Sequence, residues 1–302
     1  MSPTAQLIVL FILLALGYAG CKLKALPPET GKVLTKLVFT ITLPATILSS
    51  VTSGSITIQG SDAALFILKV LLVYLIFMAI AIPSSRLLST DQRTRGMLSF
   101  MLIFGNVAFM GLPVTAAIFG DRAIFYVALA GLPFWLASFS LGMSLVAGKK
   151  EKFDPKTLIT PVFIASILLI PLALANLRIP VIISEAIGLT GSITTPASML
   201  IIGATLAQAP IKNVFTDWRL YPLAFIKLVI IPLAVWLILR IFVTDELILG
   251  VLVIISAMPT AAIAAMFAIE HNNNETMASG GVFLTTLFSA ITIPLIVHLL
   301  LR

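Results

Sequence analysis

The sequence predicts an all-α membrane protein with about ten transmembrane helices, arranged as two inverted five-helix repeats. Three observations support this fold class. Of the 302 residues, 60% are hydrophobic and only 10% are charged, whereas soluble domains are about 45–50% apolar and about 25% charged. The apolar residues gather in runs long enough to cross a bilayer. The basic residues gather on one side of these runs, as orientation signals do.

Charged residues, prolines and glycines divide the chain into ten apolar runs. One span needs about 20 apolar residues, so ten spans leave no room for a sizeable domain outside the bilayer. This composition excludes a cytosolic enzyme, a disordered protein and, with Cys21 the single cysteine, a secreted disulfide scaffold. The first run lacks the basic start of a signal peptide and is expected to remain as a span. The expected spans are 4–21, 31–52, 63–84, 96–119, 122–147, 157–177, 181–207, 220–242, 246–269 and 275–300.

The basic residues predict the orientation of the chain. Thirteen of the 19 Lys and Arg residues lie in the loops or at the span ends on the side reached after odd-numbered spans, four lie on the other side, and Lys69 and Lys227 lie deeper within spans. Positive residues favour the cytoplasmic side, so both termini are expected in the periplasm and the linker 148–156 in the cytoplasm. The net charge of +7 is therefore an orientation signal, and no nucleic-acid partner is expected. The thirteen residues are Lys22, Lys24, Lys32, Lys36, Arg86, Arg93, Arg95, Lys149, Lys150, Lys152, Lys156, Lys212 and Arg219; the four are Arg122, Arg178, Arg240 and Arg302.

The halves on either side of the linker resemble each other. The segment 42–48 (TLPATIL) is similar to 194–200 (TTPASML), and Lys69 and Lys227 occupy corresponding spans, as do Pro113 and Pro259. Each half has an odd number of spans, so the second enters the membrane from the opposite side. Residues 1–147 and 157–302 are therefore predicted to form an inverted repeat, an architecture of many secondary transporters.

Spans 4 and 9 are expected to be interrupted. Proline removes a backbone donor and clashes with the preceding turn, so Pro113 beside Gly111, and Pro259, should each open a helix near the middle of the bilayer. A half-helix that begins at such a break presents free N–H groups, which suit an anion; a plain proline kink is the alternative. The candidate substrate-binding residues are Gly105, Asn106, Gly111, Pro113, Met258, Pro259, Thr260, Lys69 and Lys227.

Three side chains carry the polar chemistry of this candidate site. Asn106 is the single Asn well inside an expected span; its amide suits a carboxylate or the unwound backbone, or it forms an interhelical hydrogen bond. Lys69 and Lys227 are intramembrane charges that either support an anion path or extend to the interface. Spans 3–5 and 8–10 contain no deep Asp or Glu, which argues against cation transport. No metal or cofactor is expected.

Several motifs resemble the auxin efflux carrier family, which includes plant PIN carriers and bacterial carriers of the malonate-transporter type. The first is Asn106-x-x-x-Met-Gly-Leu-Pro113, and the others are Ala-Met-Pro259, Phe267-Ala-Ile-Glu-His-Asn272 and Ser279-Gly-Gly-Val-Phe283. The resemblance implies a NhaA/PIN-like fold with crossing helices 4 and 9. It also implies a scaffold of spans 1, 2, 6 and 7 that dimerises, a moving transport domain of spans 3–5 and 8–10, and substrate contact by Asn106. Plant members often carry an Asp where this chain has Leu65.

These observations predict a multi-pass protein of the bacterial inner membrane and not an enzyme. The predicted function is secondary transport of a small organic anion, either an auxin-like carboxylate or a dicarboxylate, by elevator-like alternating access. The alternatives are a carrier resembling the bile-acid/sodium symporters, a non-transporting receptor and an intramembrane enzyme. The expected partners are the anion, the lipid bilayer and a second copy of the chain.

Overall fold

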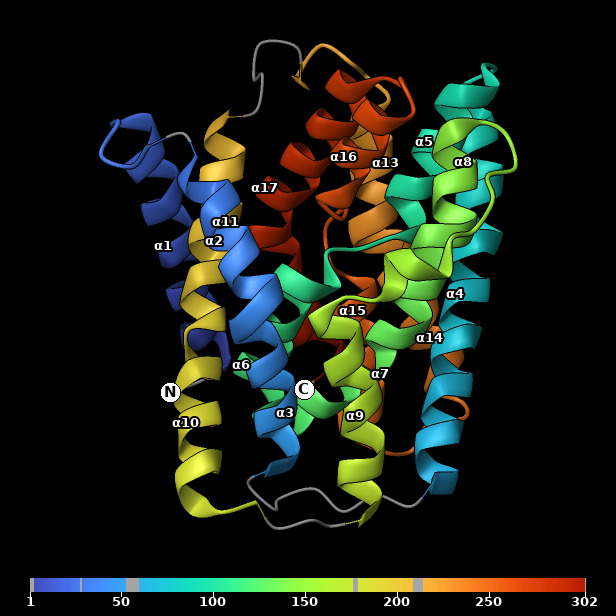
Figure 1. Cartoon of the computed structure of the whole chain (residues 1–302). Coiled ribbons are helices and arrows are strands. Elements are labelled where there is room, and N and C mark those ends of the chain that lie inside the picture. Colours follow the sequence, from blue (N-terminus) through green and yellow to red (C-terminus); the bar gives the residue numbers. More distant parts are fainter. Residues whose placement is uncertain (1–2, 28, 53–59, 176–178, 209–213, 302) are drawn as a thin grey trace. The chain divides into compact units, whose positions relative to one another are not determined.

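The structure is a computed structural model that describes residues 3–27, 29–52, 60–175, 179–208 and 214–301, and its regular elements are helices (Figure 1). Among the described residues, seven helices are long and apolar enough to cross a membrane: Pro3–Lys22, Thr30–Thr52, Gly60–Leu88, Arg122–Ala147, Val181–Gln208, Leu220–Leu239 and Glu275–Leu300. Three shorter apolar helices are Val107–Phe119, Pro161–Ala175 and Glu246–Ser256. The predicted all-helical membrane class is thus confirmed at this coarser level. Lys212, Arg178, Arg302 and the last two residues of the expected span 157–177 lie outside the described residues.

Contacts group the chain into two compact units, each described by itself. Unit 1 comprises Met1–Leu68, Ala108–Leu132 and Pro155–Gln208. Its helices are α1 (Pro3–Lys22), α2 (Thr30–Leu37), α3 (Leu43–Thr52), the start of α4 (Gly60–Leu88), α6 (Leu112–Phe119), most of α7 (Arg122–Ala137), α9 (Pro161–Ala175), α10 (Val181–Ser192) and α11 (Thr194–Gln208).

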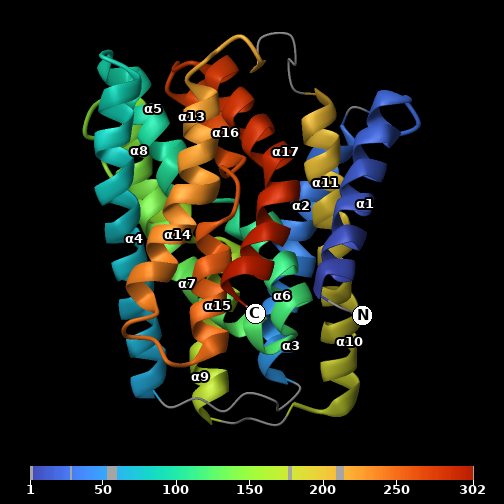
Figure 2. The same ribbon diagram turned by 180° about the vertical axis from the view of Figure 1, so that it is seen from behind.

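Unit 1 is held together by very close helix packing between α1 and α11, which lie side by side (Figures 1 and 2). Two glycines make this possible. A Cβ on Gly203 would collide with the backbone carbonyl of Leu14, and a Cβ on Gly17 would collide with that of Leu200. Small residues allow helix backbones to approach in this way, and close packing is a main source of helix association in membranes.

A buried group of threonines joins the two similar sequence segments within unit 1. The Thr46 hydroxyl lies 2.7 Å from the Thr194 hydroxyl and 2.8 Å from the carbonyl of Gly191. The Thr194 hydroxyl lies 2.9 Å from that of Thr42. These hydroxyls satisfy one another away from solvent, which avoids the cost of an unpaired buried polar group.

Unit 2 comprises Lys69–Val107, Pro133–Asp154 and Ala209–Arg302. It contains the rest of α4 and α7, α5 (Gln92–Ile103), α8 (Met143–Ala147), α13 (Leu220–Phe225), α14 (Ile231–Leu239), α15 (Glu246–Ser256), α16 (Ile263–Glu270) and α17 (Glu275–Leu300). Helices α13 and α17 pack against each other, as Figure 2 shows from behind. Three side-chain caps start helices here. Asp91 accepts a hydrogen bond from the backbone N–H of Thr94 before α5, Asp245 from that of Ile248 before α15, and Asn274 from that of Met277 before α17.

Both expected interruptions exist, but one lies elsewhere than predicted. The chain leaves helical geometry between α15 and α16, around Pro259, as expected. In the earlier span, α5 ends at Ile103 and a π-helical turn begins at Val107, so the break precedes Gly111 and Pro113. Pro113 instead lies inside the continuous helix Val107–Phe119, directly after its π-helical turn Val107–Gly111, so the helix passes through this proline without opening. The prediction that Gly111 and Pro113 open the helix was therefore wrong.

Candidate functional site

The two interrupted segments meet inside unit 2 through their backbones. Gly105 and Thr260 form an isolated antiparallel bridge. The N–H of Asn106 donates to the carbonyl of Pro259 at 2.7 Å, and the N–H of Ala261 donates to the carbonyl of Phe104 at 3.0 Å. Backbone polar groups buried in a membrane protein must find such partners, because no water is available to them. The two breaks are therefore paired with each other, and this pair of segments, residues 104–106 and 259–261, is called the crossing.

The pairing leaves carbonyls at the end of α5 without their usual helical donors, and side chains replace those donors. In an uninterrupted helix the carbonyl of Leu102 would accept from the N–H of Asn106. Here it accepts from the ammonium of Lys227 at 3.0 Å. The carbonyl of Met101 accepts from the hydroxyl of Thr260 at 3.1 Å. A cation at this position also complements the negative C-terminal end of the helix dipole.

Lys227 is completely buried in the protein, with 0% of its surface exposed. Its Nζ lies 5.2 Å from the centre of the Phe77 ring, at a distance suited to a cation–π contact. It forms no ion pair within the part of the chain that the structure describes. The ammonium therefore points into the protein and not toward an interface, where it contacts the carbonyl of Leu102 and the ring of Phe77.

Gly105 brings the backbone next to this ammonium. A Cβ at this glycine would lie 3.2 Å from Cβ of Met258, 3.3 Å from the Met258 carbonyl oxygen and 3.4 Å from Nζ of Lys227. A side chain would have to displace these groups by a few tenths of an ångström. The lack of a side chain at residue 105 thus lets the two breaks approach each other and leaves the cation against the backbone.

The structure brings six of the nine predicted residues together in unit 2. They are Gly105, Asn106, Met258, Pro259, Thr260 and Lys227. Asn106 is buried, with 6% of its surface exposed. Gly111 and Pro113 belong to unit 1. Lys69 is half-buried and forms no hydrogen bond or ion pair with the described residues, so the two lysines differ in environment.

Several groups of the site could not be recognised from the sequence alone. The carbonyls of Met101 and Leu102 become acceptors only because a distant segment takes the donors that would face them. The Thr285 hydroxyl accepts from the N–H of Thr260 at 3.1 Å, and Phe77 lies beside Lys227. The one signal that points to this arrangement is the combination of Lys227 and Pro259 in neighbouring apolar runs.

The site lacks the groups that would hold a metal, as far as the described residues go. No cluster of three or more His, Cys, Asp or Glu occurs in that part of the chain. The donors gathered at the crossing are instead backbone N–H groups, hydroxyls, an amide and one ammonium, and several of them already donate to protein acceptors. These groups recognise oxygen atoms of an anionic or strongly polar ligand.

A comparison with known families shows to which family the chain belongs. The model of a family described as membrane transport proteins, the auxin efflux carriers, matches residues 3–297. The chain belongs to the auxin efflux carrier family. The resemblance inferred from the motifs around Asn106 and Pro259 is thereby confirmed.

Relatives of this auxin efflux carrier family protein match it over almost their whole length. An uncharacterized transporter of Methanothermobacter thermautotrophicus is 26% identical over 98% of this chain and 97% of the relative. A protein of Rhizobium meliloti named as a candidate malonate transporter is 22% identical over 98% of this chain and 95% of its own. An uncharacterized transporter of Escherichia coli is 21% identical over 97% and 96%. The chain is thus a multi-pass membrane transporter of this family.

Proposed function

We propose that this chain is a secondary transporter of a small organic anion, either a monocarboxylate or a dicarboxylate such as malonate. The observation that carries the proposal is the completely buried ammonium of Lys227, which lies beside the backbone of Gly105 and forms no ion pair with the described residues. The relative named as a candidate malonate transporter supports the same class of substrate. The positive N-terminal ends of the segments that follow the two breaks favour an anion as well.

The ammonium is only partly neutralised where it lies. The C-terminal end of a helix is equivalent to roughly half a negative charge, so α5 leaves part of the Lys227 charge for a ligand near Gly105 and Asn106. Asn106 supplies amide donors that can bind a carboxylate. We infer that substrate binds at the crossing and that alternating access proceeds by elevator-like movement of spans 3–5 and 8–10 against a scaffold of spans 1, 2, 6 and 7.

Asn106→Ala should abolish or strongly weaken uptake of the substrate. Losing a hydrogen bond to a charged ligand group costs about 1.5–3 kcal/mol, roughly ten- to a hundredfold in affinity. A thermal-shift screen of mono- and dicarboxylates identifies a ligand, and radiolabelled uptake into proteoliposomes then compares variant and wild type at equal protein density. Gln92→Ala, which removes an exposed amide at the start of α5, is the control and should transport normally. If Asn106→Ala takes up the substrate like the wild type, the substrate does not bind at the crossing.

The proposed topology has ten spans in two inverted repeats, 1–147 and 157–302, with the linker 148–156 in the cytoplasm. Two features support the repeat: both broken segments pair at corresponding points, and the threonines of the similar segments contact each other. We further propose a homodimer formed through the scaffold. An apolar groove of about 380 Å³ beside α10 in unit 1, with Ile41, Ile182 and Ile183 in its lining, is a suitable face for it.

Cysteines introduced into the linker 148–156 test the orientation. With both termini in the periplasm, an impermeant thiol reagent added to intact cells should leave a cysteine at Lys150 unlabelled and should label it after the cells are opened. A cysteine at Arg122, expected on the periplasmic side, should react in intact cells. The variants are compared in a Cys21→Ser background. Labelling of the Lys150 position in intact cells would reverse the proposed orientation.

A further inference from the structure

A polar pocket lies in unit 2 between the end of α4 and the segment before α13, away from the crossing residues. Its volume is about 630 Å³, and its lining includes Arg86, Ser89, Thr90, Thr216, Trp218 and Arg219. The count of basic residues puts this end of unit 2 on the cytoplasmic side. The transport mechanism proposed above uses none of these side chains.

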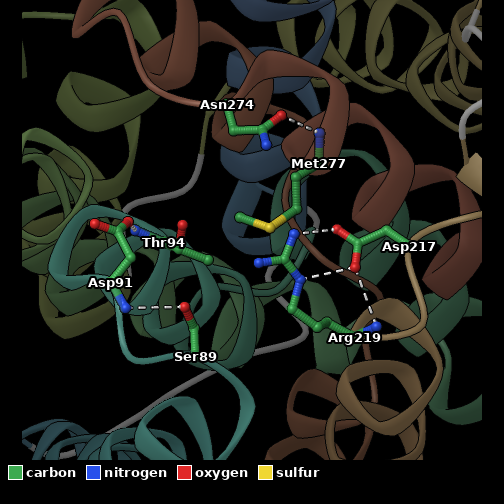
Figure 3. Close-up of polar contacts among 7 residues, drawn as sticks. All are labelled: Ser89, Asp91, Thr94, Asp217, Arg219, Asn274 and Met277. Atoms are coloured by element: carbon green, nitrogen blue, oxygen red, sulfur yellow. Dashed lines mark hydrogen bonds and ion pairs between the residues drawn. The ribbon is translucent and has the colours of Figure 1, made fainter.

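The acidic group in the pocket is already paired. The guanidinium of Arg219 donates to both carboxylate oxygens of Asp217, at 2.8 and 2.7 Å, as Figure 3 shows. These hydrogen bonds hold the pKa of the Asp217 carboxyl below its usual range, and Asp217 in turn raises the pKa of Arg219. A bidentate pair of this kind keeps both groups charged and fixed. Asp217 and Arg219 together contribute no net charge to the pocket.

Arg86 supplies the remaining charge. It lies in the last turn of α4 and forms no hydrogen bond or ion pair with the residues that the structure describes. The lining thus has a net charge of about +1 and hydroxyl donors from Ser89 and Thr90. The planar fork of an arginine matches a phosphate group, so the free charge and the hydroxyls are complementary to one phosphate monoanion.

The same pocket has an apolar edge. The side chain of Leu87 is 86% exposed and that of Trp218 is 63% exposed, and both residues line the pocket. Tryptophan is enriched at the level of lipid headgroups because its ring is apolar and its N–H is polar. A water-soluble phosphate would gain nothing from these two side chains, whereas a phospholipid would place its glycerol and the start of its acyl chains against them.

We propose that this pocket binds the headgroup of an anionic phospholipid, with the phosphate on Arg86 and the upper acyl chain along Leu87 and Trp218. Basic side chains next to a span attract anionic lipids in general. This pocket differs from a basic surface in being concave and in holding the guanidinium of Arg86, which has no hydrogen-bond or ion-pair partner among the described residues. The proposal does not depend on the identity of the transported anion.

The test is lipid binding by the purified full-length protein in nanodiscs. Phosphatidylglycerol should be retained in preference to phosphatidylcholine, as measured by native mass spectrometry and by the melting temperature. Arg86→Gln should reduce the preference about tenfold, as expected for loss of a charged hydrogen bond. Arg95→Gln removes the same charge from the same expected side but not from the pocket, so it should leave the preference intact. Trp218→Ala should weaken binding of the lipid while leaving the charge in place.

Inorganic phosphate distinguishes the two sources of a phosphate group. At millimolar concentration it should neither raise the melting temperature nor displace phosphatidylglycerol. If phosphate alone reproduces the stabilisation, the ligand is a soluble phosphate and the lipid proposal is wrong. If Arg86→Gln retains the preference, or Arg95→Gln loses it equally, the attraction belongs to the charged surface as a whole and the pocket is not a lipid site.

Discussion

Lys227→Gln is expected to reduce transport at least about tenfold while the protein still folds. An ammonium about 6 Å from a carboxylate, at an effective dielectric constant near 20, stabilises it by roughly 3 kcal/mol before screening. Glutamine is one atom shorter than lysine, but its amide is a donor that can be directed at the carbonyl of Leu102 after a small shift of the side chain. The main change is the loss of the charge. The measurement is uptake into proteoliposomes at equal protein density, with the melting temperature recorded in parallel.

Two further variants separate the role of the charge from that of the fold. Lys149→Gln, in the exposed linker, is the matched control and should transport like the wild type. Lys69→Gln should show a smaller loss than Lys227→Gln, since Lys69 is only half-buried. Because a buried charge costs desolvation energy, Lys227→Gln should not lower the melting temperature. Normal uptake by a stable Lys227→Gln protein would exclude the ammonium from anion transport.

Gly203→Leu is expected to prevent stable folding of unit 1. Even a Cβ at this position collides with the carbonyl of Leu14 and lies 2.6 Å from the backbone nitrogen of Tyr18, so α1 and α11 would have to move apart. Overpacking of a core costs about 1–3 kcal/mol and sometimes more, and here the obstacle is backbone, which cannot change rotamer. The melting temperature in detergent should fall by at least about 5 °C, or the protein should aggregate on size-exclusion chromatography.

Gly188→Leu, in α10, is the matched control for this substitution. A Cβ at Gly188 meets no atom within 4 Å, so the same change of residue should leave the melting temperature within about 1 °C of the wild type. Gly17→Leu should resemble Gly203→Leu, because its Cβ would meet the Leu200 backbone on the other side of the same contact. A stable Gly203→Leu protein would show that α1 and α11 do not pack as closely as the structure has them.

The apolar runs of the sequence predicted the helical segments closely, because span length follows from bilayer thickness. The run 275–300 became α17, Glu275–Leu300, and the run 4–21 became α1, Pro3–Lys22. The pairing of distant segments could not be predicted in the same way. The break after Ile103 depends on hydrogen bonds from Asn106 and Ala261 that cross between the two segments. Local rules instead favoured Pro113, which lies inside the helix Val107–Phe119 just after its π-helical turn.

The candidate site, like the fold, could be predicted from the sequence only in part. Proline, glycine, asparagine and lysine inside apolar runs are visible in the sequence, and Gly105, Asn106, Pro259 and Lys227 do meet. The difference between the two lysines was not visible, since both lie in corresponding runs. Only the fold shows that the Lys227 ammonium reaches a freed carbonyl and that Lys69 does not share this environment. π-helical turns, such as Ile226–Ile230 around Lys227, also depend on packing that no local pattern records.

The contact between α1 and α11 has a consequence for how the protein is made. Ribosomes add about 5–20 residues per second, so α11 leaves the ribosome roughly ten to forty seconds after α1. During that interval the glycine face of α1 has no partner from its own chain and must be covered by lipid or by the insertion machinery. The contact between α1 and α11 therefore forms only after the first helix has been inserted.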